Sequence, residues 1–456
     1  MIGQSLWAHG EHLTRHREHE AHSGNHYLTN ALGLICLGTA FLPDPRAERW
    51  LSHGRNILDR EILRQFFADG LNYEGSLAYH GLALEICLLG MLLLDRIQRP
   101  LGEASRERLE RALDVSLAVT RPDSSIPVIG DVDDGHILPL GQRPPRSQAH
   151  LLALGGALYG RSDLVEAGRL ATTEIRWLRI EVPVHETSVP HQEPRSIQFP
   201  QGGLVVLRSA SHHLTIDCGD PGSLGRGGHG HSDLLSFEAF AHNRPVIVDA
   251  GTYCYTADGE ARNRYRSTKL HNTLLVDGRE TLEPDGLWAF RQTATPRILR
   301  WSETEDLDVF SGEYEVPGRG ILHCRTILFD RTMGGWLIED KIRGIDRHAL
   351  ELRFHVPSTA IEMESQRVRV DLGNGVGVLV ERIDGDLPNL VIAPATASPI
   401  YLTEHATTLI AITGEVTLPA RCLTALVPYE GQCPDRAAIQ AWARDRAHEL
   451  HRNAPR

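Results

Sequence analysis

The sequence lacks the cysteine patterns and the long apolar runs that mark several common protein classes. Its seven cysteines are scattered and none forms a Cys-x-x-Cys pair, so neither a disulfide scaffold nor a cysteine zinc site is expected. The apolar run at residues 82–94 is too short to span a membrane and predicts a buried helix. The polar first 20 residues do not form a secretory signal, which leaves a cytoplasmic location open.

An excess of positive charge is also absent, because the net charge is −12. This balance argues against a general nucleic-acid-binding protein, although a local basic cleft could still bind a polyanion. The glycines at residues 222–230 lack the spacing of a phosphate-binding loop, and we expect them to let the backbone approach a ligand closely. With 456 residues the chain is too long for one ordinary core, so two domains are expected.

Hydrophobic periodicity divides the chain into two halves. Residues 1–180 carry apolar side chains at helical spacing with short connections, which predicts antiparallel helices as in bundles or α/α toroids. The proline-rich stretch 181–200 predicts a linker. Residues 201–430 contain short β-branched runs bounded by turn residues, which predicts a β-sandwich. The charged tail 431–456 is expected to hold one surface helix at 435–450.

Side chains of the metal-binding type occur at three places in the β-rich half. His229 and His231 are two residues apart, Asp249 ends an apolar run, and His271 begins another. Residues i and i+2 of an extended segment point to the same side, so the two imidazoles can share a site. One Asp and two His from neighbouring strands fit a zinc site; the alternative is a set of hydrogen-bonded polar groups at strand ends.

The helical half contributes two further motifs. Asn25 and His26 stand at a predicted helix start, and Glu74 precedes a turn that leads to Tyr79 at another helix start. As isolated features, such residues are typical of helix caps or packed polar groups. The acidic stretch 131–135 is faintly similar to a calcium loop, but Gln142 stands where that loop needs a glutamate, so a turn is expected.

Four motifs follow one another in a characteristic order. They are GNHYLTNALGL from Gly24, YEGSLAYHGLALE from Tyr73, GGHGHSDLLSFEAFAHNRPVIVDAGTY from Gly227 and RYRSTKLHNTLLVDG from Arg264. The segment FPQGGLVVLRS from Phe199 precedes the third of them. Together they resemble the heparinase II/III family over residues 20–90 and 199–280, with weaker similarity to about residue 360.

This resemblance implies an α+β multidomain fold, in which an incomplete α/α toroid is followed by an antiparallel β-sandwich with a cleft between them. Family members cleave acidic polysaccharides such as heparan sulfate or alginate, and the resemblance implies a periplasmic or cell-envelope location. The residues that match the family's catalytic and active-site positions are Tyr79, Asn25, His26 and His229. The family's metal ligands, which imply a structural zinc ion, match His231, Asp249 and His271.

Cleavage by β-elimination explains why such residues are needed. Removal of the C5 proton of a uronic acid places charge on the C6 carboxylate, which Asn25 and His229 could stabilise by donating hydrogen bonds. Tyr79 would take the C5 proton or return one to the leaving oxygen, with His26 as the alternative base. Because a free tyrosine has a pKa of about 10, neighbouring cations would have to lower it. The candidates, each alternatively a solvated loop charge, are Arg262, Arg264, Arg266 and Lys269. The expected substrate-binding residues are Glu74, Arg226, Arg262 and Arg266.

Two other functions compete with the lyase interpretation. The Asn-His motif begins at residue 25, whereas family members usually carry a long helical region before it, and a short toroid favours an inert polysaccharide-binding or exopolysaccharide-assembly protein. A glycoside hydrolase is the third alternative, but it needs two carboxyl groups beside the bond, and only Glu74 is suitable among the helical motifs. The lyase interpretation predicts that Asn25, Tyr79 and His229 converge on one cleft.

Overall fold

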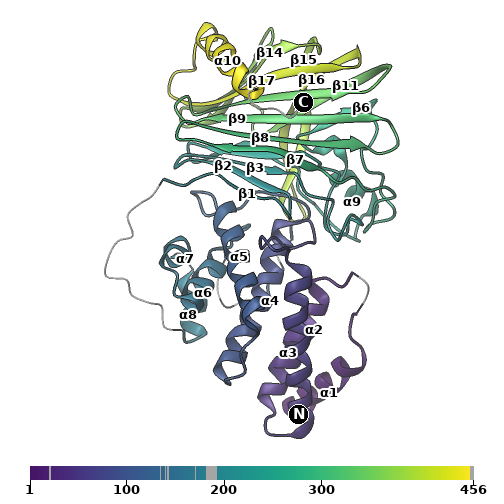
Figure 1. Cartoon of the computed structure of the whole chain (residues 1–456), viewed down its shortest axis with the longest axis vertical. Coiled ribbons are helices and arrows are strands. Elements are labelled where there is room, and N and C mark those ends of the chain that lie inside the picture. The colour runs from purple at the N-terminus through teal and green to yellow at the C-terminus, as the bar shows by residue number, and fades with distance from the viewer. Residues whose placement is uncertain are drawn as a thin grey trace. The chain divides into compact units, whose positions relative to one another are not determined.

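The computed structural model describes residues 1–19, 22–133, 135–138, 140, 143–169, 171–180 and 193–451. The chain forms two compact units (Figure 1). The first, called the helical unit, comprises Met1–Thr120, Ser124–Ile126 and Asp134–His191. The second, called the β unit, comprises Arg121–Asp123, Pro127–Asp133 and Gln192–Arg456. A short segment from the N-terminal half of the sequence therefore belongs to the β unit.

The helical unit is a set of helices around one apolar core, in which α2 packs against α3 and α4. Local sequence sets the helix starts: the Asp44 side chain accepts from the Arg46 amide at α3, and the Ser76 side chain caps α4. At the end of α6, Gly160 takes the left-handed conformation that favours glycine. The helices described are α1 (Ile2–Arg15), α2 (Asn25–Ala40), α3 (Pro45–Gln65), α4 (Leu77–Arg96), α5 (Glu103–Val119), α6 (Ala149–Tyr159), α7 (Ser162–Ala167) and α8 (Thr172–Trp177).

Helix α4 is longer than the apolar run at 82–94 suggests, because it spans Leu77–Arg96. By length and composition it is apolar enough to cross a membrane. However, 83% of its most apolar window is buried in the protein, as expected for the core helix of a globular unit. Its burial on nearly all sides explains why its hydrophobicity shows little amphipathic pattern.

The described strands of the β unit form three sheets, and their pairings are antiparallel. One sheet has the order β1 (Ile197–Phe199), β2 (Leu204–Arg208), β3 (His212–Asp217), β4 (Phe237–Ala241) and β5 (Arg244–Ile247). The largest has the order β12 (Ile361–Glu364), β13 (Arg367–Gly373), β14 (Val376–Gly385), β17 (Ala420–Glu430), β10 (Gly335–Arg343), β9 (Ile321–Asp330), β8 (Leu307–Val316) and β7 (Arg297–Glu303). The third has the order β15 (Asn389–Ile400), β16 (Thr403–Thr417), β11 (Arg347–Val356) and β6 (Leu274–Val276).

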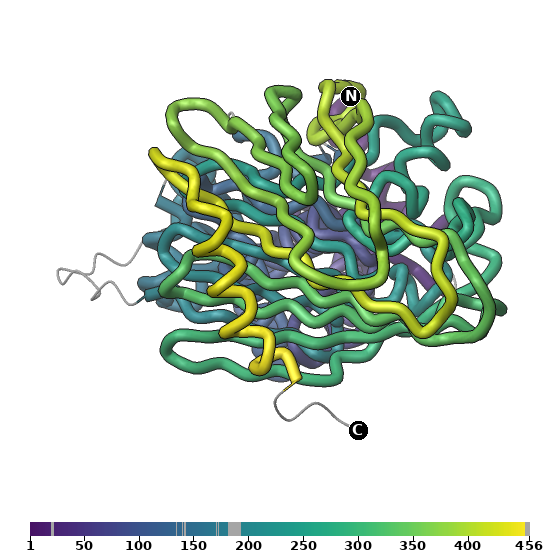
Figure 2. The backbone as a smooth tube through the Cα atoms, turned by 90° about the horizontal axis from the view of Figure 1, so that it is seen from above, coloured from purple at the N-terminus to yellow at the C-terminus, as the bar shows by residue number. Residues whose placement is uncertain are grey.

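Two apolar clusters stabilise the β unit. The larger one joins side chains of all three sheets, among them the buried Phe237, Trp336 and Phe354. The smaller one lies beneath α10 (Arg436–His451), where Ile439 packs with Leu337. Figure 2 shows α10 lying across the strands near the C-terminal end of the chain. The helix predicted at 435–450 is therefore confirmed, and its apolar residues cover the outer face of the large sheet.

Two segments differ from the sequence-based expectation. Of the predicted linker 181–200, residues 181–192 lie outside the described residues, and Ile197–Phe199 forms β1 by pairing with β2. Strand pairing thus begins before residue 200, because Phe199 is buried opposite Leu204. The β-rich half also contains the helix α9 (Gly259–Tyr265) and the turn η1 (Thr268–Leu270), which were not predicted. The Asp258 side chain starts α9 by accepting from the amides of its first turn.

Candidate active site and metal centre

Asn25 begins α2 and is held by Glu74 from the loop before α4. The Asn25 amide donates to Glu74 Oε1 at 2.8 Å, and its side-chain Nδ2 donates to Oε2 at 2.9 Å. Both residues are buried. A Cβ at Gly24 would lie 2.8 Å from Glu74 Oε2, so glycine is needed for this approach. The first two motifs of the sequence therefore meet, although the paired residues are 49 positions apart.

Tyr79 lies in the first turn of α4, where its amide donates to the Ser76 hydroxyl at 3.1 Å. Its side chain is largely buried. The next residue, His80, accepts from the Asn72 amide through Nδ1 at 3.2 Å and lies 3.1 Å from the Ala112 carbonyl through Nε2. Burial lowers the pKa of His80 to about 4, so the ring is neutral at physiological pH. This neutral ring ties the loop that carries Glu74 to helix α5.

His26 has a different environment from its neighbour Asn25. Its side chain is 69% exposed, and its Nδ1 lies 2.6 Å from Oε2 of the exposed Glu18. Asn25, His26 and Tyr79 belong to the helical unit, whereas His229 belongs to the β unit. The predicted convergence of these residues on one cleft stays a prediction.

Asp131 is the centre of a buried charge network in the β unit. Its Oδ2 accepts from His229 Nδ1 and its Oδ1 from His231 Nε2, each at 2.9 Å. Arg262 binds both carboxylate oxygens, with Nη2 2.7 Å from Oδ2. Burial alone would raise the pKa of Asp131, but the hydrogen bonds from both histidines and the charge of Arg262 hold it far below its usual range. Asp131 is therefore a buried anion that binds both histidines of the HGH motif.

His231, Asp233 and His271 form a buried group that could hold a metal ion. One ligand atom from each lies within 4.8 Å of the others. His231 Nδ1 and His271 Nε2 have no hydrogen-bond partner in the described part of the chain. The opposite nitrogen of each ring is bonded to a carboxylate, Asp131 for His231 and Asp249 for His271. A carboxylate that accepts from one ring nitrogen fixes the tautomer and leaves the other nitrogen's lone pair available for a metal.

Asp249 lies beside this group as the partner of His271. Its Oδ2 is 2.6 Å from His271 Nδ1, and its Oδ1 accepts from the Gly251 amide at 2.9 Å. Burial lowers the pKa of His271, but the adjacent Asp249 carboxylate outweighs it and raises that pKa to about 8. The structure thus brings the predicted ligands His231 and His271 together and adds Asp233, which the sequence analysis did not select.

Two basic residues that were weighed as solvated loop charges are buried instead. Arg262 and Arg266 have no exposed surface with which to contact a substrate directly. Arg266 donates to the Leu287 carbonyl at 2.6 Å and lies 4.0 Å from the centroid of the Phe290 ring. Burial lowers the pKa of Arg266 to about 10. The solvated alternative is wrong for this pair because buried acceptors and rings surround each guanidinium. The basic residues of this region that are exposed are Arg226, Arg264 and Lys269.

Family profiles match both halves of the chain. Residues 4–137 match the heparinase II/III N-terminus, and residues 191–437 match the heparinase II/III-like C-terminal domain. The chain belongs to the heparinase II/III family. The resemblance carried by the four sequence motifs is therefore confirmed.

Curated relatives of this heparinase II/III family member are longer than the chain itself. The heparin-sulfate lyase of Pedobacter heparinus is 22% identical over 400 residues, which are 84% of this chain and 54% of the relative. The heparin-sulfate lyase of Bacteroides stercoris is 21% identical over 368 residues, which are 77% of this chain and 49% of the relative. The chain thus spans about half the length of these curated relatives.

Solved structures confirm the predicted fold class. A heparan sulfate lyase from Pedobacter heparinus superposes with a TM-score of 0.74 at 19% identity, covering 95% of this chain and 64% of that one. A heparinase III structure gives a TM-score of 0.75 at 19% identity, covering 93% and 64%. The helical region followed by antiparallel sheets is consistent with the toroid and β-sandwich expected of this family.

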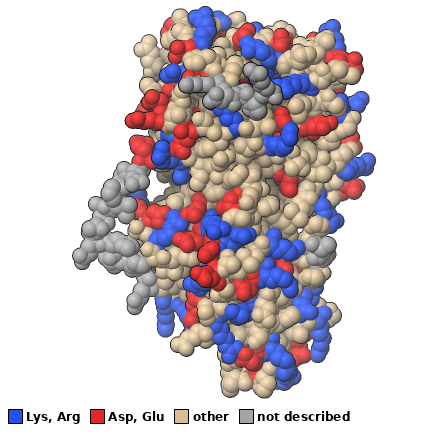
Figure 3. All heavy atoms as spheres, in the orientation of Figure 1, with Lys and Arg blue, Asp and Glu red and all other residues tan. Residues whose placement is uncertain are grey.

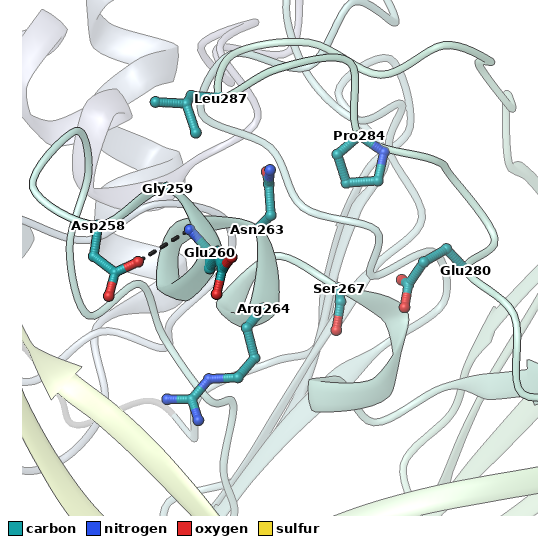
Figure 4. A pocket seen from close by; sticks show the side chains of 9 residues that line it. All are labelled: Asp258, Gly259, Glu260, Asn263, Arg264, Ser267, Glu280, Pro284 and Leu287. Carbon is teal, nitrogen blue, oxygen red and sulfur yellow. Dashed lines mark hydrogen bonds between the residues drawn. The ribbon is translucent and has the colours of Figure 1, made fainter.

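A cavity of about 680 Å³ lies beside α9, but its lining does not suit an acidic polymer (Figure 4). Asp258, Glu260 and Glu280 contribute carboxylates, and the one basic side chain, Arg264, is paired with Glu404. None of the residues predicted to act in catalysis, substrate binding or metal binding is among the described residues that line it, although Arg264, a candidate cation beside the tyrosine, is. On the face shown in Figure 3, basic and acidic side chains are interspersed rather than separated.

Asp131 and Asp233 are the functional candidates that sequence reasoning missed. A signal for Asp131 was present, because it stands one glycine after the apolar segment 126–129, much as Asp249 directly follows the apolar run 245–248. A carboxylate at the end of an apolar segment needs a partner. The spacing of the acidic residues at 131–135, similar to that of a calcium loop, does not indicate that the first of them is buried.

Proposed function

We propose that this heparinase II/III family member is a polysaccharide lyase that cleaves a uronate-containing acidic polysaccharide by β-elimination. The proposal rests on the ordered matches to the N-terminal and C-terminal heparinase II/III domains, because each domain contributes predicted site residues. The names of its relatives from Pedobacter heparinus and Bacteroides stercoris, both heparin-sulfate lyases, support the same reaction class. The substrate partner would accordingly be an acidic polysaccharide.

Asn25 and His229 would stabilise the C6 carboxylate of the bound uronate. One hydrogen of Asn25 Nδ2 is donated to Glu74, and an amide nitrogen carries a second that can be donated to a substrate oxygen. His229 is oriented by Asp131, which accepts from its Nδ1. Hydrogen bonds that strengthen as negative charge grows on the carboxylate stabilise the transition state more than the ground state.

Tyr79 would carry the proton. Its phenolate oxygen takes the C5 proton, the electron pair of the C5–H bond forms the C4–C5 double bond, and the C4–O bond breaks. The phenol then returns the proton to the leaving oxygen, so the tyrosine is regenerated without a co-reactant. In this scheme Glu74 positions Asn25 through both carboxylate oxygens. Its side chain is buried, so it acts through Asn25 rather than on the substrate.

We further propose that the metal group holds a structural zinc ion. The unpartnered His231 Nδ1 and His271 Nε2 fit zinc ligands, and a buried carboxylate completes the set. The family resemblance names Asp249 as that carboxylate, whereas the geometry favours Asp233 because Asp249 is engaged by His271 Nδ1. A bound zinc ion would neutralise buried carboxylate charge and link the segments that carry its ligands.

Product analysis tests the lyase proposal. Acidic polysaccharides incubated with the protein should yield oligosaccharides with a C4–C5 double bond, detected by their ultraviolet absorbance. Tyr79→Phe keeps the ring but loses the ionisable oxygen, so we expect kcat to fall by roughly 10²–10⁴ while folding is unchanged. Near-normal rates in this variant would remove Tyr79 from the mechanism and favour His26, which His26→Ala then tests. New reducing ends without ultraviolet absorbance would indicate hydrolysis, and binding without any product would indicate the inert alternative.

Metal analysis tests the zinc proposal separately from activity. Purified protein should contain about one zinc ion per chain, and His271→Ala should lose the metal together with thermal stability. Asp233→Asn should weaken zinc affinity more than Asp249→Asn if Asp233 is the ligand; the reverse order supports the family assignment. Metal-free protein with unchanged stability after exposure to zinc would contradict the proposal.

A further inference from the structure

Two aromatic side chains lie beside His229 in the β unit, and a third packs against one of them. Tyr255 follows β5, Trp288 lies between β6 and β7, and Tyr401 lies in the turn that joins β15 to β16. The Tyr255 ring centroid is 5.3 Å from that of Trp288 and 5.2 Å from that of Tyr401. The His229 ring lies 5.8 Å from Trp288 and 6.4 Å from Tyr255. Tyr255, Trp288 and Tyr401 are called the aromatic rim below.

A hydrogen bond and a buried cation fix the aromatic rim. The Tyr255 amide donates to the Tyr401 hydroxyl at 3.0 Å. The Arg262 guanidinium lies 5.2 Å from the Tyr255 centroid and 5.1 Å from the Trp288 centroid. The same guanidinium binds Asp131, the carboxylate that orients the adjacent histidine. The rim and the histidine thus share one buried support. Because these side chains are already ordered, the entropic cost of binding a ligand is lower.

The aromatic rim is not part of a closed core. Trp288 is 42% exposed, whereas Trp336 inside the sandwich is fully buried. Backbone hydrogen bonds hold the surrounding loops in place, from the Gly228 amide to the Trp288 carbonyl at 3.0 Å and from the Leu402 amide to the Tyr253 carbonyl at 2.7 Å. A large ring that is held firmly and still faces water beside a polar histidine is typical of a ligand-binding surface.

We propose that the aromatic rim is a subsite for a pyranose ring, next to the uronate whose carboxylate His229 contacts. The inference rests on the proposed function for the role of His229. One face of a pyranose presents C–H groups, which pack favourably on the electron-rich face of an aromatic ring, while the hydroxyls remain at the sugar's edge. The exposed Arg226, on the same loop as His229, would pair with a sulfate or carboxylate at that edge.

Trp288 variants test this subsite in the full chain. Trp288→Ala removes the ring, Trp288→Phe keeps an aromatic face, and Trp177→Ala is the control because Trp177 is 69% exposed on α8 of the other unit. Kinetics on heparan sulfate are combined with titrations of heparan sulfate tetrasaccharides in a Tyr79→Phe background, followed by tryptophan fluorescence. We expect Trp288→Ala to raise both KM and Kd about tenfold, which corresponds to about 1.4 kcal/mol, with kcat changed less than about twofold. Trp288→Phe and Trp177→Ala should bind nearly normally.

Each outcome separates the subsite from the lyase proposal. Unchanged KM and Kd in Trp288→Ala, in a chain that forms unsaturated products, would overturn the subsite alone. Binding that depends on Trp288, without unsaturated product from any acidic polysaccharide, would support the subsite and overturn the lyase. If Trp288→Ala does not fold, the fluorescence titration decides. A saccharide-induced change that is present with Trp288 and absent in Trp288→Phe supports contact between the saccharide and Trp288. An identical change with Trp288 and in Trp288→Phe overturns the subsite. If the wild-type chain shows no binding and no turnover, both the subsite and the lyase proposal are overturned.

Discussion

The candidate site residues of the helical unit and those of the β unit are held by different kinds of interaction. In the helical unit, Asn25 and Tyr79 stand at helix starts, and the Glu74 carboxylate accepts two hydrogen bonds from Asn25. In the β unit, His229 is held by the fully buried Asp131, whose charge is balanced by the fully buried Arg262. The hydrogen bonds from Asn25 to Glu74 hold one helix start, whereas loss of either partner of the buried pair Asp131–Arg262 leaves a charge without its counter-ion inside the protein. The β unit should therefore be damaged more by loss of one charge.

Of the variants that test this difference, Arg262→Met should cause the largest loss of stability. It leaves Asp131 buried without its cation, and removing one partner of a buried ion pair destabilises a protein by about 3–5 kcal/mol. Urea unfolding of the β unit measures the change. Arg264→Met is the matched control, because Arg264 forms an exposed pair with Glu404 that contributes roughly 0–1 kcal/mol. Equal losses in the two variants would show that the buried network does not carry the stability assigned to it.

Glu74→Gln should have an intermediate effect, confined to the helical unit. The carboxylate accepts two hydrogen bonds from Asn25, and hydrogen bonds to charged groups contribute about 1.5–3 kcal/mol. Hydrogen exchange of the amides in the first turn of α2 should speed up accordingly. Glu18→Gln, which alters only an exposed contact with His26, should leave exchange unchanged. Faster hydrogen exchange across the β unit in Glu74→Gln would contradict the expectation that this effect is confined to the helical unit.

His80 provides a smaller, pH-dependent test in the helical unit. Its folded-state pKa of about 4 lies below the unfolded value of about 6.5, so the unfolded chain binds the proton first. The contribution of His80 to the stability of this unit should fall as the pH drops from about 6.5 to about 4, by about 3 kcal/mol, and level off below that range. The partners of the ring, Asn72, Ala112 and Ser116, are neutral. His80→Gln should reduce this slope without abolishing it, because burial also lowers the pKa of His150 in the same unit to about 3. An unchanged slope would assign it to groups other than His80.

Much of the fold followed from the sequence because its signals are local. Helical periodicity located the helices, and turn-bounded β-branched runs located strands such as β2, β9 and β14. The four ordered motifs also indicated the family. Local pattern did not reveal that residues 127–133, within the predicted helical half, belong to the β unit. Nor did it reveal α9, whose start depends on a single capping aspartate.

The sequence alone thus determined the two-part fold class, the family and several candidate residues, including His229, His231 and His271. Only the tertiary structure decided which charges are buried together: Asp131 with Arg262, and Asp233 with the two metal-type histidines. The aromatic rim is likewise a product of folding, since its rings come from loops that follow different strands. The physical reason is that periodicity reports burial along one element, whereas the partner of a buried charge or ring is set by the packing of distant segments.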